Sequence, residues 1–344
     1  MTTYPMAMVS APGRIEFVER ALPERGPKDV LIGVKAASIC GSDLHIYKGR
    51  HPSAPLPVAV GHELSGEVLE VGRDVTRIRP GDRVTVEPAL VCGKCDFCQR
   101  GQYHLCTDIS FQYRRGQGAF APFFVAPEER VFRLPAGLSY ESGALIEPLA
   151  VAIHAVKKAN ISLGQSIAVF GAGAIGLLVM MLARRVSGGP VLIVDVQAAR
   201  LQAALELGAT RAIDSRAEDA VQVIMDHTQG LGVDRSFEAV GLEVTLVQAL
   251  RALKKGGQAT LLGIFEELKT VIPANLFIQR EITLAGSQGY NWDFQAGLAL
   301  LAGGDFPLGA LVTHRYPLER IQEGFDLLLS PENPAIKVVA LVDA

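Results

Sequence analysis

The sequence lacks the features that mark exported, membrane or nucleic-acid-binding proteins. Its 344 residues hold 33 basic and 36 acidic side chains, so no positive charge excess favours nucleic acid. The first residues, MTTYPMAMVSAPGRIEF, have neither the basic nor the apolar region of a signal peptide. The longest apolar stretch, IAVFGAGAIGLLVMMLA, is interrupted by glycines and is shorter than a membrane span needs. We therefore expect a cytoplasmic protein that binds neither membranes nor nucleic acid.

Cysteine is scarce, with five in the chain, and four of them lie within CGKCDFCQRGQYHLC. Two disulfides would need an oxidising compartment, whereas in a reducing one such clusters bind metal or catalyse. A ferredoxin-type iron–sulfur run has a shorter last spacing and a proline after it, but here Thr107 follows. The spacing C-x2-C-x2-C-x7-C instead favours one tetrahedral zinc with no open position for a substrate. The predicted structural zinc ligands are Cys92, Cys95, Cys98 and Cys106, in a lobe at 88–108.

The hydrophobic pattern changes near residue 150, in a chain too long for one ordinary core. Before it, short alternating runs such as DVLIGVKAASI are separated by turn residues, which predicts a partly open β-barrel. After it, buried strands such as SIAVF and VLIVD alternate with helical runs, which predicts a doubly wound parallel sheet. The rhythm weakens near Gly286, and the segment ending AIKVVALV is expected to rejoin the first domain. The predicted α/β protein thus has one domain at 1–149 with 290–344, and another at 150–289.

The motif GAGAIG follows a predicted strand and opens a predicted helix, as a dinucleotide-binding turn requires. Gly171 would permit the tight turn, Gly173 would let the backbone approach a pyrophosphate, and Gly176 would let the helix pack on the strand. The helix N-terminus would offer unpaired N–H groups to the phosphates. Asp195 ends the next strand, where it can accept hydrogen bonds from both ribose hydroxyls and would repel a 2′-phosphate. NAD is therefore favoured over NADP.

Further candidate cofactor contacts follow predicted strand ends, because open α/β sheets bind ligands at that edge. Together with the two residues inside the glycine motif, these positions are Ala174, Ile175, Val240, Gly241, Gly263, Gly286, Ser287 and Gln288.

A second candidate metal site combines Cys40, His62, Glu63 and Glu147. Taken singly, each has an ordinary explanation, as a core cysteine, part of a turn or a helix cap. Thiolate, imidazole and carboxylate together suit zinc, and three protein ligands leave a position for water or substrate. The dinucleotide motif favours the catalytic interpretation, because a Lewis acid beside a nicotinamide ring can oxidise an alcohol.

The whole set of motifs resembles the zinc-dependent medium-chain dehydrogenase/reductase family, over essentially the full length. The matching segments are CGSDLH, GHE, the four-cysteine lobe, IEPLAVAIHA, and GAGAIG with Asp195. The segment LIEPLAV resembles the sorbitol and other polyol dehydrogenase branch, whereas typical alcohol dehydrogenases of the family have a cysteine ligand where Glu147 stands. The resemblance implies a GroES-like catalytic domain, a Rossmann domain, one catalytic and one structural zinc per chain, NAD, and a homo-oligomer, either tetramer or dimer.

The resemblance also implies roles for single residues. Zinc would polarise a substrate hydroxyl, with Glu63 and Glu147 each either a direct ligand or a water-bridged neighbour. Ser42 would accept the substrate proton and His45 would pass it to solvent. Arg200 matches the family's basic residue beside the adenosine. Outside these motifs, Arg114 and Arg115 either bind a substrate carboxylate or phosphate or are solvated loop charges.

These observations predict NAD-dependent oxidation of a secondary alcohol on a polyol or sugar-derived substrate. Aldonate dehydrogenase or L-threonine 3-dehydrogenase activity is the close alternative; arginines at the substrate would favour the former, and IEPLAV disfavours the latter. An electron-transfer protein that uses the cysteine cluster is an alternative of another class, and the cysteine spacing argues against it. A catalytically silent paralogue is a third, and the retained metal ligands and motif glycines argue against it.

Overall fold

The computed structural model describes residues 3–51, 54–267, 269–330 and 333–342. The chain forms two compact units, Met1–Glu147 with Asn291–Ala344, and Pro148–Tyr290. The sequence places this division after residue 149 and before residue 290. None of the helices in the described residues is long and apolar enough to cross a membrane.

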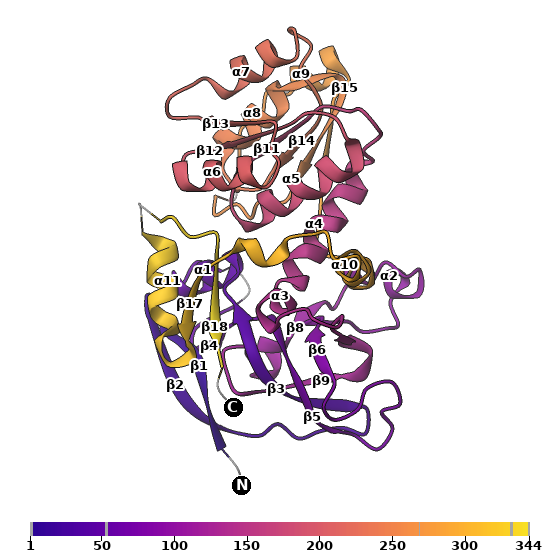
Figure 1. Ribbon diagram of the computed structural model, residues 1–344, viewed down its shortest axis with the longest axis vertical. Helices are drawn as coiled ribbons and strands as arrows, with labels where there is room; N and C mark the ends of the chain where they lie inside the picture. The colour runs from indigo at the N-terminus through magenta and orange to yellow at the C-terminus, as the bar shows by residue number, and fades with distance from the viewer. Residues whose placement is uncertain (1–2, 52–53, 268, 331–332, 343–344) are drawn as a thin grey trace. The chain divides into compact units, whose positions relative to one another are not determined.

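The first unit consists mainly of antiparallel strands (Figure 1). Its largest sheet has the order β10-β6-β5-β3-β18-β17, with β9 also paired to β3. A second sheet has the order β2-β1-β4, and β7 pairs with β8. The strands are β1 (Thr3–Ala11), β2 (Arg14–Ala21), β3 (Asp29–Ser38), β4 (Val58–Ala59), β5 (Glu63–Val71), β6 (Arg83–Val86), β7 (Ala89–Leu90), β8 (Ser110–Phe111), β9 (Phe123–Pro127), β10 (Val131–Arg133), β17 (Val312–Pro317) and β18 (Lys337–Leu341).

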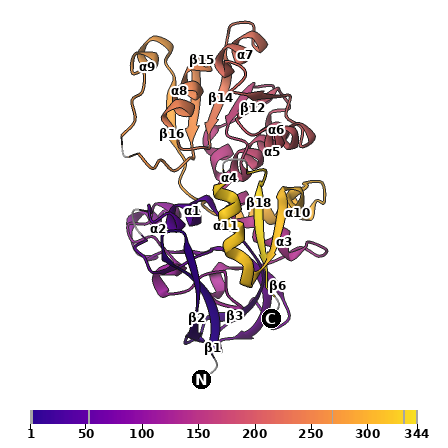
Figure 2. The ribbon, with the colours of Figure 1, turned by 90° about the vertical axis from the view of Figure 1, so that its left-hand side faces the viewer.

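Strand β3 is central to this unit because it pairs with β5, β9 and β18. Its apolar residues are buried almost throughout, as expected of a strand covered on both faces. The C-terminal strand β18 joins antiparallel to β3, with Val339 opposite Ser38, so the end of the chain rejoins the first unit. Figure 2 shows helix α11 (Ile321–Leu329) beside β18, and the two are in contact.

Short helices connect these strands, and several of them carry candidate site residues. The helical segments of the first unit are α1 (Gly41–Tyr47), α2 (Asp96–Gln99), η1 (Tyr103–Leu105), η2 (Gln112–Arg115), η3 (Glu128–Arg130), α3 (Tyr140–Ala144), α10 (Asp293–Ala302), η4 (Leu308–Leu311), η5 (Leu318–Arg320) and α11. Helix α4 (Ile146–Ala159) begins in the first unit and continues into the second.

The second unit is a six-stranded parallel sheet with the order β13-β12-β11-β14-β15-β16. Its strand order reverses between β11 and β14, where a doubly wound sheet opens a crevice for a ligand. Helices α5 and α6 lie on one face and α8 on the other (Figures 1 and 2). The elements are β11 (Ile167–Phe170), α5 (Ala174–Ser187), β12 (Val191–Asp195), α6 (Ala198–Glu206), β13 (Arg211–Asp214), α7 (Ala220–His227), β14 (Val233–Glu238), α8 (Glu243–Arg251), β15 (Leu253–Leu261), α9 (Asn275–Arg280) and β16 (Thr283–Gly286).

Candidate metal and dinucleotide sites

The four clustered cysteines converge in one lobe of the first unit. Their sulfur atoms all lie within 4.8 Å of one another. The lobe is held by local backbone geometry, since Cys95 caps the start of α2 and Cys106 ends η1. The backbone N–H groups of Cys92 and Asp108 point at the Cys106 sulfur, at 3.3 and 3.4 Å. All five cysteines are free thiols, so the disulfide alternative is wrong.

The donor chemistry of this lobe fits a thiophilic cation. Backbone N–H groups of Cys98 and Thr107 lower the pKa of the Cys95 thiol to about 6, so this sulfur readily becomes a thiolate. Burial raises the pKa of the neighbouring Cys98 thiol to about 12. Four ionised sulfurs at this spacing would repel one another, and a divalent cation among them removes that repulsion.

The donor atoms of Cys40, His62 and Glu63 form a second group, again within 4.8 Å of one another. Cys40 immediately precedes α1, and His62 immediately precedes β5. The antiparallel register of β3 and β5 places Ser38 opposite Glu63, which brings these separate segments together. Among the described residues, this group and the cysteine lobe are the two candidate metal sites.

Asp43 orients this second group, although no sequence pattern predicted a role for it. Its buried carboxylate accepts hydrogen bonds from the N–H groups of Cys40 (3.0 Å) and Gly61 (3.1 Å). It also lies 3.5 Å from His62 Nδ1. Burial alone would raise the pKa of Asp43, but His62 and these N–H groups outweigh it and lower that pKa. This contact places a proton on His62 Nδ1, which faces Asp43, so that the unprotonated Nε2 could bind a metal.

Lys337 is the other residue that sequence reasoning missed. Its Nζ lies 2.7 Å and 2.6 Å from the two carboxylate oxygens of Glu63 and donates to the Ile39 carbonyl at 2.9 Å. The Ser38 hydroxyl also donates to Glu63. Lys337 and Glu63 are 4% and 0% exposed, so this ion pair is fully enclosed. The available signal was a single lysine within the apolar segment AIKVVALV, because a buried cation requires a partner.

Glu147 is buried near the start of α4, but its carboxylate is not in the group formed by Cys40, His62 and Glu63. Burial raises the pKa of Glu147 to about 7. The charge of His62 opposes this shift, and that of Glu63 adds to it. Glu147 therefore interacts electrostatically with His62 and Glu63, and its carboxyl group is readily protonated.

The predicted proton-relay residues lie on the helix that begins after Cys40. Ser42 and His45 are both partly buried on α1. The Phe111 ring contacts the His62 ring, with centroids 6.0 Å apart, so β8 borders the same group. Arg114 and Arg115 are exposed on η2, immediately after β8.

The glycine motif lies at the turn between β11 and α5. Gly171 has φ of +104°, and a Cβ there would lie 2.7 Å from Val240 Cγ2. A Cβ on Gly176 would lie 1.8 Å from the Gly171 carbonyl oxygen, so only glycine lets α5 pack this closely. A Cβ on Gly173 would meet no atom within 4 Å, so the space beside it is open. Gly173 caps α5, and Ala174 and Ile175 begin the helix.

Asp195 lies against this glycine turn. Its Oδ2 accepts a hydrogen bond from Ala172 N at 2.6 Å, and its Oδ1 accepts from Val196 N and Gln197 N at 2.7 and 2.9 Å. The other candidate cofactor positions share the second unit, and most follow its strand ends. Arg200 is on α6, Val240 and Gly241 follow β14, Gly263 follows β15, Gly286 ends β16, and Ser287 and Gln288 follow it.

Comparison with known proteins adds independent findings. Residues 26–136 match the family described as alcohol dehydrogenase GroES-like domain, and residues 174–303 match zinc-binding dehydrogenase. The chain is 36% identical over 335 residues to D-arabitol-phosphate dehydrogenase of Enterococcus avium, covering 96% of this chain and 95% of that protein. It is 35% identical over 322 residues to sorbitol dehydrogenase of Bacillus subtilis strain 168, covering 92% and 91%. The crystal structure of 2R,3R-butanediol dehydrogenase from Bacillus subtilis matches with a TM-score of 0.89 and 36% identity, covering 99% and 100%.

A GroES-like unit followed by a doubly wound unit, matched over nearly the whole chain, defines a dehydrogenase. The chain belongs to the zinc-dependent medium-chain dehydrogenase/reductase family. This confirms the predicted family, the α/β fold with GroES-like and Rossmann parts, and the predicted oxidoreductase class. The electron-transfer alternative is left without support.

Proposed function

We propose that this protein oxidises a secondary alcohol of a polyol or sugar-derived substrate and transfers the hydride to NAD. The observation that carries the proposal is the group of Cys40, His62 and Glu63, whose donor atoms lie within 4.8 Å of one another, in a chain that also has a complete glycine motif with Asp195. The relatives named for arabitol phosphate, sorbitol and butanediol support this substrate class, because each of those compounds contains a secondary alcohol.

Cys40, His62 and Glu63 would hold the catalytic zinc, because one soft sulfur, one imidazole and one carboxylate suit this ion and leave a position open. When bound there, zinc would act as a Lewis acid that acidifies a substrate hydroxyl. Asp43 fixes the orientation of His62, and Lys337 fixes that of Glu63. Glu147 would be a neighbouring carboxyl rather than a direct ligand.

Ser42 and His45 would carry the substrate proton away. Their place on α1, directly after Cys40, supports this role. The Ser42 hydroxyl would accept the proton, and the His45 imidazole would pass it to solvent.

The dinucleotide would bind at the glycine turn of the second unit. Asp195 would accept hydrogen bonds from the adenosine ribose, and its charge would disfavour a 2′-phosphate, so the preferred cofactor would be NAD. Arg200, Val240, Gly263, Ser287 and Gln288 would complete the binding surface.

The four-cysteine lobe would hold a second zinc with a purely structural role, since four thiolates leave no open coordination position. As the resemblance to its family implies, the protein would form a homo-oligomer, either a dimer or a tetramer. The cytoplasmic location stays a prediction from the sequence.

The proposal is tested by measuring NADH absorbance with polyols, polyol phosphates, aldonates, L-threonine and simple alcohols as substrates, at equal concentrations. We expect the highest kcat/KM with a polyol or a polyol phosphate, and about two zinc ions per chain by elemental analysis. A marked preference for L-threonine or for an aldonate would overturn the proposed substrate class. A clear preference for phosphorylated polyols would point to Arg114 and Arg115 as the phosphate contacts.

A further inference from the structure

Glu238 is a completely buried carboxylate at the end of β14, and none of the roles above involves it. Its Oε1 accepts hydrogen bonds from the N–H groups of Val240 and Gly241, both at 2.9 Å, and from the Thr245 hydroxyl at 2.8 Å. Its Oε2 is buried without a hydrogen-bond partner among the described residues. A single carboxylate oxygen therefore determines the path of the loop that follows β14.

The main chain of Glu238 also anchors the loop that follows β15. Its carbonyl oxygen accepts hydrogen bonds from Leu262 N at 2.8 Å and Gly263 N at 3.1 Å. The two loops are in close backbone contact, since a Cβ on Gly263 would lie 2.2 Å from Gly241 N and 2.5 Å from Glu238 Oε2. Glu238 thus lies between two loops whose glycines allow them to meet around its carboxylate.

The loop after β14 in turn supports the glycine turn. Ala239 N donates to the Phe170 carbonyl at 2.9 Å, and the Val240 side chain fills the space that a Cβ on Gly171 would need. Because the strand order reverses between β11 and β14, the loops at their carboxyl ends border the crevice that binds dinucleotides in such sheets. The contacts of Glu238 therefore extend to the proposed dinucleotide site.

We propose that Glu238 is a positioning residue for the dinucleotide. It holds the loop at 239–241 against the glycine turn and the loop at 262–264 against the loop at 239–241, in the shape that the dinucleotide binds. A carboxylate suits this task because its charge strengthens the three hydrogen bonds at Oε1, and loops ordered in advance need not be ordered on binding. The inference rests on the proposed dinucleotide-dependent function and adds a residue that lies beneath the site without touching its ligand.

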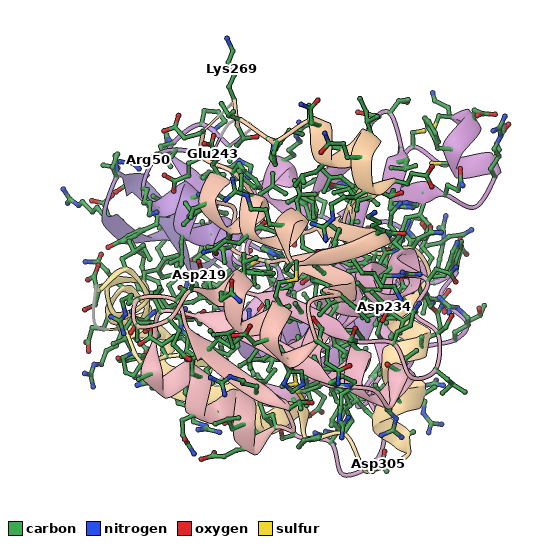
Figure 3. All side chains as sticks on the ribbon, turned by 90° about the horizontal axis from the view of Figure 1, so that it is seen from above. Arg50, Asp219, Asp234, Glu243, Lys269 and Asp305 are labelled. Carbon is green, nitrogen blue, oxygen red and sulfur yellow. The ribbon has the colours of Figure 1, made fainter. Side chains whose placement is uncertain are left out.

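Asp234 provides a matched control at the other end of the same strand. It is also buried, accepts hydrogen bonds from Ser166 N and Oγ at 2.9 Å each, and pairs with Lys254. Figure 3 labels Asp234, which lies near the start of β14, and Glu243, which opens α8 directly beyond the loop that Glu238 holds. Ligands bind at the carboxyl ends of parallel strands, whereas Asp234 lies at the amino end of β14. Replacing Asp234 should therefore change stability but not dinucleotide binding.

The experiment compares Glu238→Gln and Asp234→Asn in the zinc-loaded full chain. NADH binding is titrated by the fluorescence of the nicotinamide, and the thermal midpoint is measured alongside. We expect Glu238→Gln to raise the Kd for NADH about tenfold, with kcat at saturating NAD changed less than the KM for NAD. Asp234→Asn should lower the thermal midpoint and leave the Kd within about twofold of wild type.

Thr245→Val is the milder second variant, because it removes one of the three donors to Glu238 and keeps the side-chain shape. We expect it to raise the Kd for NADH about threefold, which keeps the proposal testable if Glu238→Gln does not fold. An unchanged Kd in the Glu238 and Thr245 variants would overturn the inference alone. The inference would also be overturned if the Kd rose in all three variants in proportion to the fall in the thermal midpoint, because Glu238 would then have only a structural role. Failure of the wild-type protein to bind NADH would overturn the proposed function as well.

Discussion

Replacing Lys337 with methionine removes the cation that faces Glu63 and keeps most of the apolar side chain. Both residues are enclosed, at 4% and 0% exposed, and Nζ lies 2.6 to 2.7 Å from the carboxylate oxygens. The variant leaves a buried carboxylate with the Ser38 hydroxyl beside it. Removing one partner of a buried ion pair costs about 3–5 kcal/mol, a large share of the about 5–15 kcal/mol that keeps a protein folded.

The size of this loss should depend on metal. In chelator-treated protein, we expect Lys337→Met to lower the free energy of unfolding by about 3 kcal/mol. With zinc bound, the loss should be smaller, because the metal would provide Glu63 with a second cation. Urea unfolding can be followed by Trp292, the single tryptophan, which lies in the first unit and donates its indole N–H to the Gly101 carbonyl at 2.9 Å.

Two controls separate charge burial from general disruption. Lys337→Met combined with Glu63→Gln should be more stable than Lys337→Met alone, because the unpaired charge is gone. Arg320→Met breaks an exposed pair with Glu323, in which Arg320 is 60% exposed, and should lower the free energy of unfolding much less than Lys337→Met does. The reasoning about a buried charge pair is wrong if Lys337→Met lowers the free energy of unfolding no more than Arg320→Met does. It is also wrong if the double variant is no more stable than Lys337→Met alone.

The two metal sites should separate by mutation. Cys40→Ser should lower zinc to about one per chain and abolish turnover with the fold intact, whereas Cys95→Ser should chiefly lower the thermal midpoint; the opposite pattern would refute this division. Asp195→Ala should reduce the preference for NAD over NADP in kcat/KM, and an unchanged preference would contradict its ribose contact. The hydrogen bonds of Arg315 lower the pKa of Glu141, so their stabilisation is present above the ordinary glutamate pKa and is lost as the pH falls through the lowered value. Arg315→Gln should therefore lower the urea midpoint at neutral pH and converge with wild type in acid; a constant difference would contradict the link.

Sequence patterns predicted those parts of the protein whose chemistry depends on local spacing. The glycine motif specifies a turn through residues that are close in the chain, and the structure has the tight φ at Gly171 and the close packing at Gly176. The cysteine lobe is similarly local, because short spacings limit how four sulfurs can be arranged. Sequence patterns did not decide whether Glu147 is a direct metal ligand, since its distance from Cys40 and His62 depends on how α4 begins.

The sequence by itself determined the α/β class, the family, the cysteine lobe and the glycine turn. In each, periodicity or short spacing carries the information, and neighbouring residues in the chain remain neighbours in space. Only the tertiary structure brought Lys337 to Glu63, Asp43 to His62, and the Glu238 carboxylate between two loops. The physical reason is that strand register and burial decide these contacts. A charged side chain needs a partner once it is enclosed, and the fold determines which one it meets.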